Sequence, residues 1–64
     1  MDIWSEILSR NPERIRHAFQ TLNTQEKISV RAHLVRMISE DGWHPGQVQS
    51  ASIALEAIKD LPDA

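Results

Sequence analysis

The sequence predicts an all-α fold, a small four-helix bundle with one short N-terminal helix and three longer helices. Apolar residues recur at the i, i+3, i+4 spacing of a helix in four segments, and no segment alternates with the period of two that a strand requires. Proline and glycine lie between or at the ends of these segments. The 64 residues make a single domain, 1–64, near the lower size limit for independent folding. Their 41% apolar content argues against a disordered chain.

The first predicted helix covers residues 2–9. Ile3, Trp4, Ile7 and Leu8 share one face at helical spacing. A helix of this length is marginal in isolation, so packing against the other helices must hold it.

The second predicted helix covers residues 12–22. Asn11 is a favourable N-cap, and Pro12 suits the first helical position, where its missing N–H is not needed. Its apolar residues form one narrow stripe: Ile15, Ala18, Phe19 and Leu22. A stripe of this width predicts a surface helix with one buried face.

The third predicted helix covers residues 25–41, with Thr24 as its N-cap. Most of its circumference is apolar, which predicts a central helix. Its polar residues fall on one stripe: Ser29, His33, Arg36 and Glu40. Arg31 interrupts the apolar side, and we expect it to extend to solvent or to pair with a carboxylate of another segment.

The fourth predicted helix covers residues 45–61 and ends where Leu61 precedes Pro62. Its core face is predicted to comprise Val48, Ala51, Ala54, Leu55, Ile58 and Leu61. Small residues recur along one ridge at Gly46, Ser50 and Ala54. We expect this ridge to allow another helix to approach closely.

The stretch EDGWHPGQ, residues 40–47, is predicted to end one helix and begin the next. Gly42 suits the position after a helix C-cap, where a positive φ is required, and Trp43 would then contact Ile38. His44 would be the N-cap of the fourth helix, and the Gln47 side chain could accept from its N–H. A contact of Trp43 and His44 with a ligand or partner is the alternative interpretation.

Catalytic and metal-binding patterns are absent from the sequence. The chain has no cysteine, which excludes a disulfide and a thiolate zinc site. Its three histidines are far apart in the sequence, and His17 and His33 are expected to lie solvated on polar helix faces. Gly46 near a helix N-terminus is not a phosphate-binding loop by itself. We therefore expect no enzyme activity, no cofactor and no metal.

Charge is unevenly distributed along the chain, whose formal net charge is −2. Residues 10–36 contain six basic and two acidic residues, a net charge of +4, whereas residues 37–64 contain one basic and five acidic residues, a net charge of −4. This pattern predicts that the two parts face each other or are both solvated. The acidic total makes nucleic-acid binding an unfavoured interpretation.

A helix-turn-helix DNA-binding regulator is the alternative functional hypothesis. The second and third helices and the short turn between them resemble that unit in outline, and Gln25, Lys27 and Ser29 would then approach the bases. Two features oppose this role: the third helix is apolar on most of its sides, as a core helix is, and the basic residues that could contact phosphates are spread over several faces.

The leading hypothesis is a small non-catalytic protein–protein interaction or regulatory module that forms a homodimer and has an unknown protein partner. A chain this small, without disulfide or metal, often gains stability by association. The candidate interface lies on the fourth helix: Ser50, Ile53, Ala54 and Ala57. Alternatively, Trp4 and Ile7 of the first helix cover the same strip, and the monomer would then leave no apolar surface exposed there.

The cellular location of the protein is predicted from two features that the sequence lacks. No apolar run approaches the roughly 20 residues of a membrane span, and the acidic N-terminus does not resemble a signal peptide. We therefore expect a soluble, cytoplasmic protein without a membrane partner.

Overall fold

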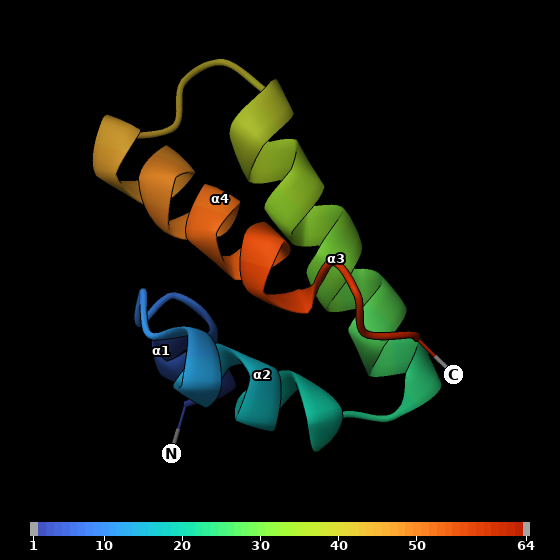
Figure 1. Cartoon of the computed structure of the whole chain (residues 1–64). Coiled ribbons are helices and arrows are strands. Elements are labelled where there is room, and N and C mark those ends of the chain that lie inside the picture. Colours follow the sequence, from blue (N-terminus) through green and yellow to red (C-terminus); the bar gives the residue numbers. More distant parts are fainter. Residues whose placement is uncertain (1, 64) are drawn as a thin grey trace.

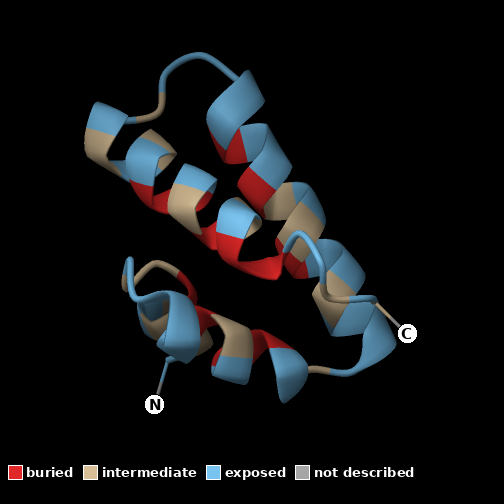
Figure 2. Cartoon of the chain, viewed as in Figure 1, coloured by how far each residue is buried: buried red, intermediate tan, exposed pale blue. Residues whose placement is uncertain are grey.

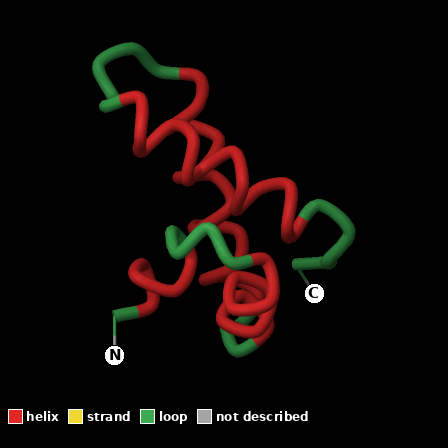
Figure 3. Tube along the Cα trace, turned by 60° about the vertical axis from the view of Figure 1, so that its left-hand side comes forward, coloured by secondary structure: helices red, strands yellow, loops and turns green. Residues whose placement is uncertain are grey.

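The computed structural model describes residues 2–63, which fold into four helices as the sequence predicted. The helices are α1 (Ile3–Ile7), α2 (Pro12–Gln20), α3 (Thr24–Ser39) and α4 (Pro45–Ile58). α3 and α4 form an antiparallel hairpin, and α1 and α2 lie across one side of it (Figure 1). The described residues contain no strand, and short loops join the helices (Figure 3).

One hydrophobic core forms where α2, α3 and α4 meet (Figure 2). The largest fully buried side chains come from all four helices: Ile7, Ile15, Phe19, Leu34, Met37 and Ile58. The predicted stripe of α2 is confirmed, because Ile15, Ala18 and Phe19 are buried and Leu22 packs against the core from its partly buried position. α1 contributes Ile7 and packs mainly against α2.

The N-cap of α3 is Asn23, so the prediction that Thr24 caps this helix is wrong. Asn23 has an extended backbone, and its Oδ1 accepts the Glu26 N–H at 2.8 Å. The Glu26 side chain in turn accepts the Asn23 N–H at 3.0 Å, which completes a capping box. Thr24 is therefore the first residue of the helix, and the Glu26 N–H is accepted by the side chain of Asn23 instead.

The C-terminus of α4 is capped by two arginines from other helices. Arg16 Nη1 donates to the Ala57 carbonyl at 2.9 Å, and Arg31 Nη1 and Nη2 donate to the Ile58 carbonyl at 3.4 Å. Arg31 Nη2 also donates to the Leu61 carbonyl just beyond the helix, at 2.8 Å. α4 ends at Ile58, three residues earlier than predicted. Cations near a helix C-terminus interact favourably with its dipole, so these arginines can hold the end of the helix.

Arg31, which interrupts the apolar side of α3, is paired with a carboxylate and packs on an aromatic ring. Its Nε donates to Asp63 at 3.1 Å, and its guanidinium lies 5.2 Å from the Phe19 ring centroid. The expected pairing with a carboxylate of another segment is thus confirmed. Asp63 belongs to the C-terminal segment that follows α4, and this pair holds that segment against α3.

α3 is not the central helix that its apolar composition predicted. Only Val30, Leu34 and Met37 are buried on it. The core covers one side of α3, and the opposite side has no helix against it (Figure 2). A four-helix chain with a five-residue α1 has too few elements to surround α3, so apolar side chains remain exposed there.

Candidate functional site

The small-residue ridge of α4 lies inside the molecule. Ser50, Ala54 and Ala57 are 8%, 0% and 9% exposed, so three of the four candidate interface residues offer little surface to a partner, although Ala57 lines a shallow groove. Their placement corrects the location that the sequence predicted for an interface. Ile53 remains partly exposed and lines a shallow groove beside Arg16 of α2.

The ridge allows a close approach within the chain, as its small residues suggested. α2 packs against α4 there, and Arg10 reaches across from the loop before α2. Arg10 Nε donates to Ser50 Oγ at 2.9 Å, and Ser50 Oγ donates to the Gly46 carbonyl at 3.0 Å. Ile7, one of the two side chains predicted to compete for this strip, lies in the same core cluster as Ala54 and Ala57, whereas Trp4 lies against His33 of α3.

The α3–α4 loop has the left-handed glycine and the N-cap that its sequence predicted, but α3 ends earlier than predicted: its C-cap is Glu40, so Gly42 is the second residue after the cap and not the first. Gly42 has a φ of +97°, in the left-handed region. The contact of Trp43 with Ile38 stays a prediction.

His44 is the N-cap of α4, and its Nδ1 accepts the Gly46 N–H at 3.0 Å. Gln47 Oε1 accepts the His44 N–H at 3.3 Å. The ring nitrogen Nδ1 of His44 is therefore engaged in the cap.

Trp4, His33 and Trp43 form an aromatic cluster on the side of α3. The ring centroids of Trp4 and His33 are 4.9 Å apart, and those of His33 and Trp43 are 5.7 Å apart in an edge-on arrangement. Trp43 Nε1 also donates to Glu40 at 3.4 Å. The prediction of a solvated His33 is wrong, because α1 and the α3–α4 loop bring one tryptophan to each side of its ring.

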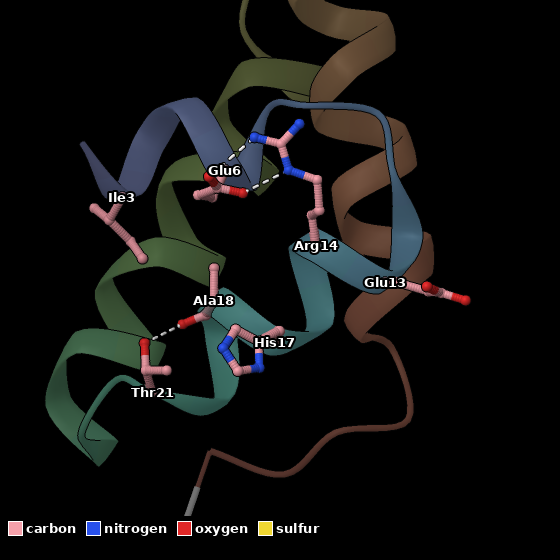
Figure 4. A pocket seen from close by; sticks show the side chains of 7 residues that line it. All are labelled: Ile3, Glu6, Glu13, Arg14, His17, Ala18 and Thr21. Atoms are coloured by element: carbon pink, nitrogen blue, oxygen red, sulfur yellow. Dashed lines mark hydrogen bonds and ion pairs between the residues drawn. The ribbon is translucent and has the colours of Figure 1, made fainter. Parts of the chain in front are cut away.

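A groove of about 490 Å³ lies between α1 and α2 (Figure 4). Ile3 and Ala18 supply apolar surface, while Glu6 and Arg14 form a two-pronged ion pair at its edge, with Arg14 Nε 2.8 Å from Oε2 and Nη2 2.9 Å from Oε1. His17 is exposed, as predicted. The sequence did not predict this groove, because it depends on how α1 lies against α2.

The electrostatics of this groove do not favour acid–base catalysis. The hydrogen bond from Arg14 holds the pKa of the Glu6 carboxyl below its usual value. A carboxyl that acts as a general acid requires a raised pKa, which comes from burial without a cationic partner. The ion pair with Arg14 therefore favours the ionised form of Glu6, which is the form opposite to that of a general acid.

The outer face of α3 is the apolar surface that the fold leaves uncovered. We define it by five exposed residues: Gln25, Ile28, Ala32, Val35 and Ser39. Ile28 and Val35 are 53% and 47% exposed, and Ile38 at its edge is 44% exposed. The spacing of three and four residues places all five in one line along the helix. The sequence showed the apolar residues, but not which side of α3 would lack a neighbour.

Most cationic side chains are already paired with carboxylates of the same chain. The pairs are Arg14–Glu6, Arg16–Asp60, Arg31–Asp63, Arg36–Glu40 and Lys59–Glu56. Three of them join the basic part of the sequence to the acidic part, as one interpretation of the charge pattern predicted: Arg16–Asp60, Arg31–Asp63 and Arg36–Glu40. Of the residues proposed to approach DNA bases, Gln25 and Ser29 are exposed, and Lys27 lies over the Phe19 ring.

Residues 2–63 contain no cluster of three or more histidine and acidic side chains arranged to hold a metal ion. Within the same residues, every helix is too short or too polar to cross a membrane. Comparisons of the chain with protein-family models, curated proteins and solved structures gave no match.

Proposed function

We propose that this protein is a small non-catalytic interaction module that associates with a second copy of itself through the outer face of α3. The observation that carries the proposal is the exposure of Ile28, Val35 and Ile38 along one side of a single helix. Exposed apolar residues scattered singly are ordinary on protein surfaces, whereas a contiguous group of them marks an interaction site.

The charges beside this face also support association. Arg31 and Arg36 border the outer face on its two sides. The Arg31 guanidinium is engaged by Asp63 and by the carbonyls at the end of α4, and Arg36 is paired with Glu40. A partner that covers the face would therefore not bury an unpaired cation. Burying a charge that has no partner is strongly unfavourable. The uncharged line from Gln25 to Ser39 can be removed from water at little electrostatic cost.

The non-catalytic part of the proposal is supported by side chains that could take part in chemistry but that already have a partner within the chain. Glu6 is held by Arg14, and the His44 Nδ1 is held by the Gly46 N–H. Trp43 packs against His33, which supports a structural role for it over a ligand contact. We also propose a cytoplasmic location, which agrees with a sequence that lacks cysteine.

Sedimentation equilibrium tests the proposal when the loading concentration is varied from about 10 µM to about 1 mM, a range set by the modest interface area expected. We expect the wild-type mass to rise toward a dimer. Val35→Glu should remain a monomer, because a charge then replaces an exposed apolar side chain at the middle of the face. Ser52→Glu, on the exposed side of α4, is the matched control and should behave as the wild type. A monomer mass at every concentration would overturn the proposal, as would a dimer that Val35→Glu leaves unchanged.

A further inference from the structure

We infer that the two copies meet with their α3 helices antiparallel and with Ala32 of both copies at the two-fold axis. This inference rests on the proposed function and adds the geometry of the contact. A two-fold interface uses the same patch on both copies, so each residue must find a suitable partner in the patch itself. The outer face of α3 meets this requirement in one orientation better than in the other.

The apolar residues of the outer face are self-complementary about Ala32. Ile28 precedes Ala32 by four residues, and Val35 follows it by three. An antiparallel arrangement centred on Ala32 therefore places Ile28 against Val35 of the second copy on both sides of the axis. The spacing of three and four is the seam of a two-stranded coiled coil, and the exposed alanine at the centre allows the helix axes to approach closely.

Charges at the edges of the seam disfavour the parallel orientation. Relative to the seam, Arg31 and Arg36 occupy the two flanking positions that meet across a parallel coiled coil. A parallel pair would place Arg31 of each copy near Arg36 of the other, where like charges repel. In the antiparallel pair, Arg36 lies near Ser29 of the second copy, and one like-charge contact remains, between the two Arg31 side chains beside the axis. Each Arg31 is paired with Asp63 of its own copy, which offsets that repulsion.

The ends of α3 favour the antiparallel orientation as well. Glu40 and Asp41 follow the C-terminus of α3, and both are exposed. An antiparallel partner places these carboxylates beside the N-terminus of the other α3, where the helix dipole is positive. The parallel orientation would instead place the acidic ends of both copies side by side.

The length of α3 sets the size of the contact. Its 16 residues span about 24 Å at 1.5 Å per residue, so it runs along most of the 30 Å long axis of the molecule. One helix pair of this length buries less than the roughly 800 Å² per partner of a standard interface. The association is therefore reversible, and a covalent trap is suited to detecting it.

Disulfide trapping tests the orientation, because the chain has no cysteine of its own. Gln25→Cys and Ser39→Cys are prepared separately, mixed in equal amounts in reducing buffer and then oxidised with glutathione. The antiparallel arrangement brings position 25 of one copy beside position 39 of the other, within the Cα–Cα reach of roughly 7 Å that a disulfide requires. We expect roughly a tenfold excess of the mixed disulfide over either symmetric one, read by mass spectrometry.

Ser52→Cys mixed with Ser39→Cys is the control, because Ser52 lies on the exposed side of α4. It should yield cross-links in random proportion and more slowly. Symmetric disulfides in excess, together with a dimer in sedimentation, would overturn the antiparallel geometry and leave the proposed function standing. Random cross-linking at the control rate, together with a monomer mass in sedimentation, would overturn both.

Discussion

Trp43 is the residue whose role in the structure is most open to a direct test. It is half-buried, and its ring lies edge-on to His33. Trp43→Ala should lower the free energy of unfolding by about 2 kcal/mol, less than the roughly 3–5 kcal/mol of a fully buried tryptophan. Trp43→Phe keeps an aromatic ring and should lose less. Urea denaturation followed by circular dichroism measures both, and an unchanged midpoint for Trp43→Ala would return this side chain to the candidates for ligand binding.

Gly42 is the second residue with a testable role, because its φ of +97° is strained for any side chain. A Cβ at this position would meet no atom within 4 Å, so the cost of a substitution comes from the backbone alone. Gly42→Ala should lose about 1 kcal/mol of stability, and Gly42→Asn less, since asparagine tolerates the left-handed region better. Equal melting temperatures for Gly42→Ala and the wild type would contradict this explanation.

Local rules predicted these loop residues well, and they failed where a distant segment intervened. The positive φ of Gly42 and the capping roles of His44 and Gln47 depend on neighbours within a few positions, and they are confirmed, although Gly42 lies one position further from the helix end than predicted. The environment of His33 depends on where α1 lies, which no local pattern encodes. The sequence therefore predicted the loop and missed the aromatic cluster.

At the scale of the elements, the start of α3 offers a direct comparison of two adjacent residues. Asn23→Ala removes the acceptor of the Glu26 N–H and should cost about 1 kcal/mol. Thr24→Ala should cost much less, because Thr24 is already the first helical residue and is exposed. Thermal denaturation of both variants measures the two losses of stability. A larger loss for Thr24→Ala would restore the cap that the sequence predicted.

The ion pairs between elements predict how stability changes with pH. Hydrogen bonds from Arg14 and Arg16 hold the pKa values of Glu6 and Asp60 below their usual ranges in the folded state. The unfolded chain then binds protons first as the pH falls, so this stabilisation is present above about pH 4 and is lost as the pH falls through the lowered values.

Denaturation midpoints measured between about pH 7 and pH 2 test this prediction, because the window includes the usual carboxyl pKa values of about 4 and extends well below them. The midpoint should decline below about pH 4, and added salt should reduce the decline by screening these exposed pairs. Glu6→Gln should decline less steeply than the wild type. A decline in Glu6→Gln as steep as in the wild type would exclude the Glu6–Arg14 pair as a source of the acid sensitivity.

The presence of the four helices could be predicted from the periodicity of the sequence, whereas the positions of their ends depended on tertiary contacts. The four segments and the apolar stripe of α2 were readable because each repeats at helical spacing. The end of α4 was predicted at Leu61 from its proline, but the helix stops at Ile58. Arg16 and Arg31, from two other helices, bind the carbonyls there, and a sequence pattern does not reveal such partners.

At the scale of the whole molecule, the sequence predicted the fold class but not which apolar side would be left uncovered. Both α3 and α4 had more apolar surface than a small bundle covers, and the sequence placed the excess on α4. The structure buries Ser50, Ala54 and Ala57 beneath α2 and leaves Ile28 and Val35 of α3 exposed. Which apolar side is left uncovered depends on where α2 packs. That packing is a tertiary feature, which local sequence patterns do not predict.

The measurement that tests self-association through α3 most directly is the change of backbone amide chemical shifts with protein concentration. Spectra at about 20 µM and about 1 mM bracket the weak affinity expected of a short helix pair. We expect the amides of Ile28, Ala32 and Val35 to shift, while those of Ser50 and Ala54 in the core of α4 stay constant. Unchanged spectra, or shifts confined to the groove around Ile53, would contradict the account.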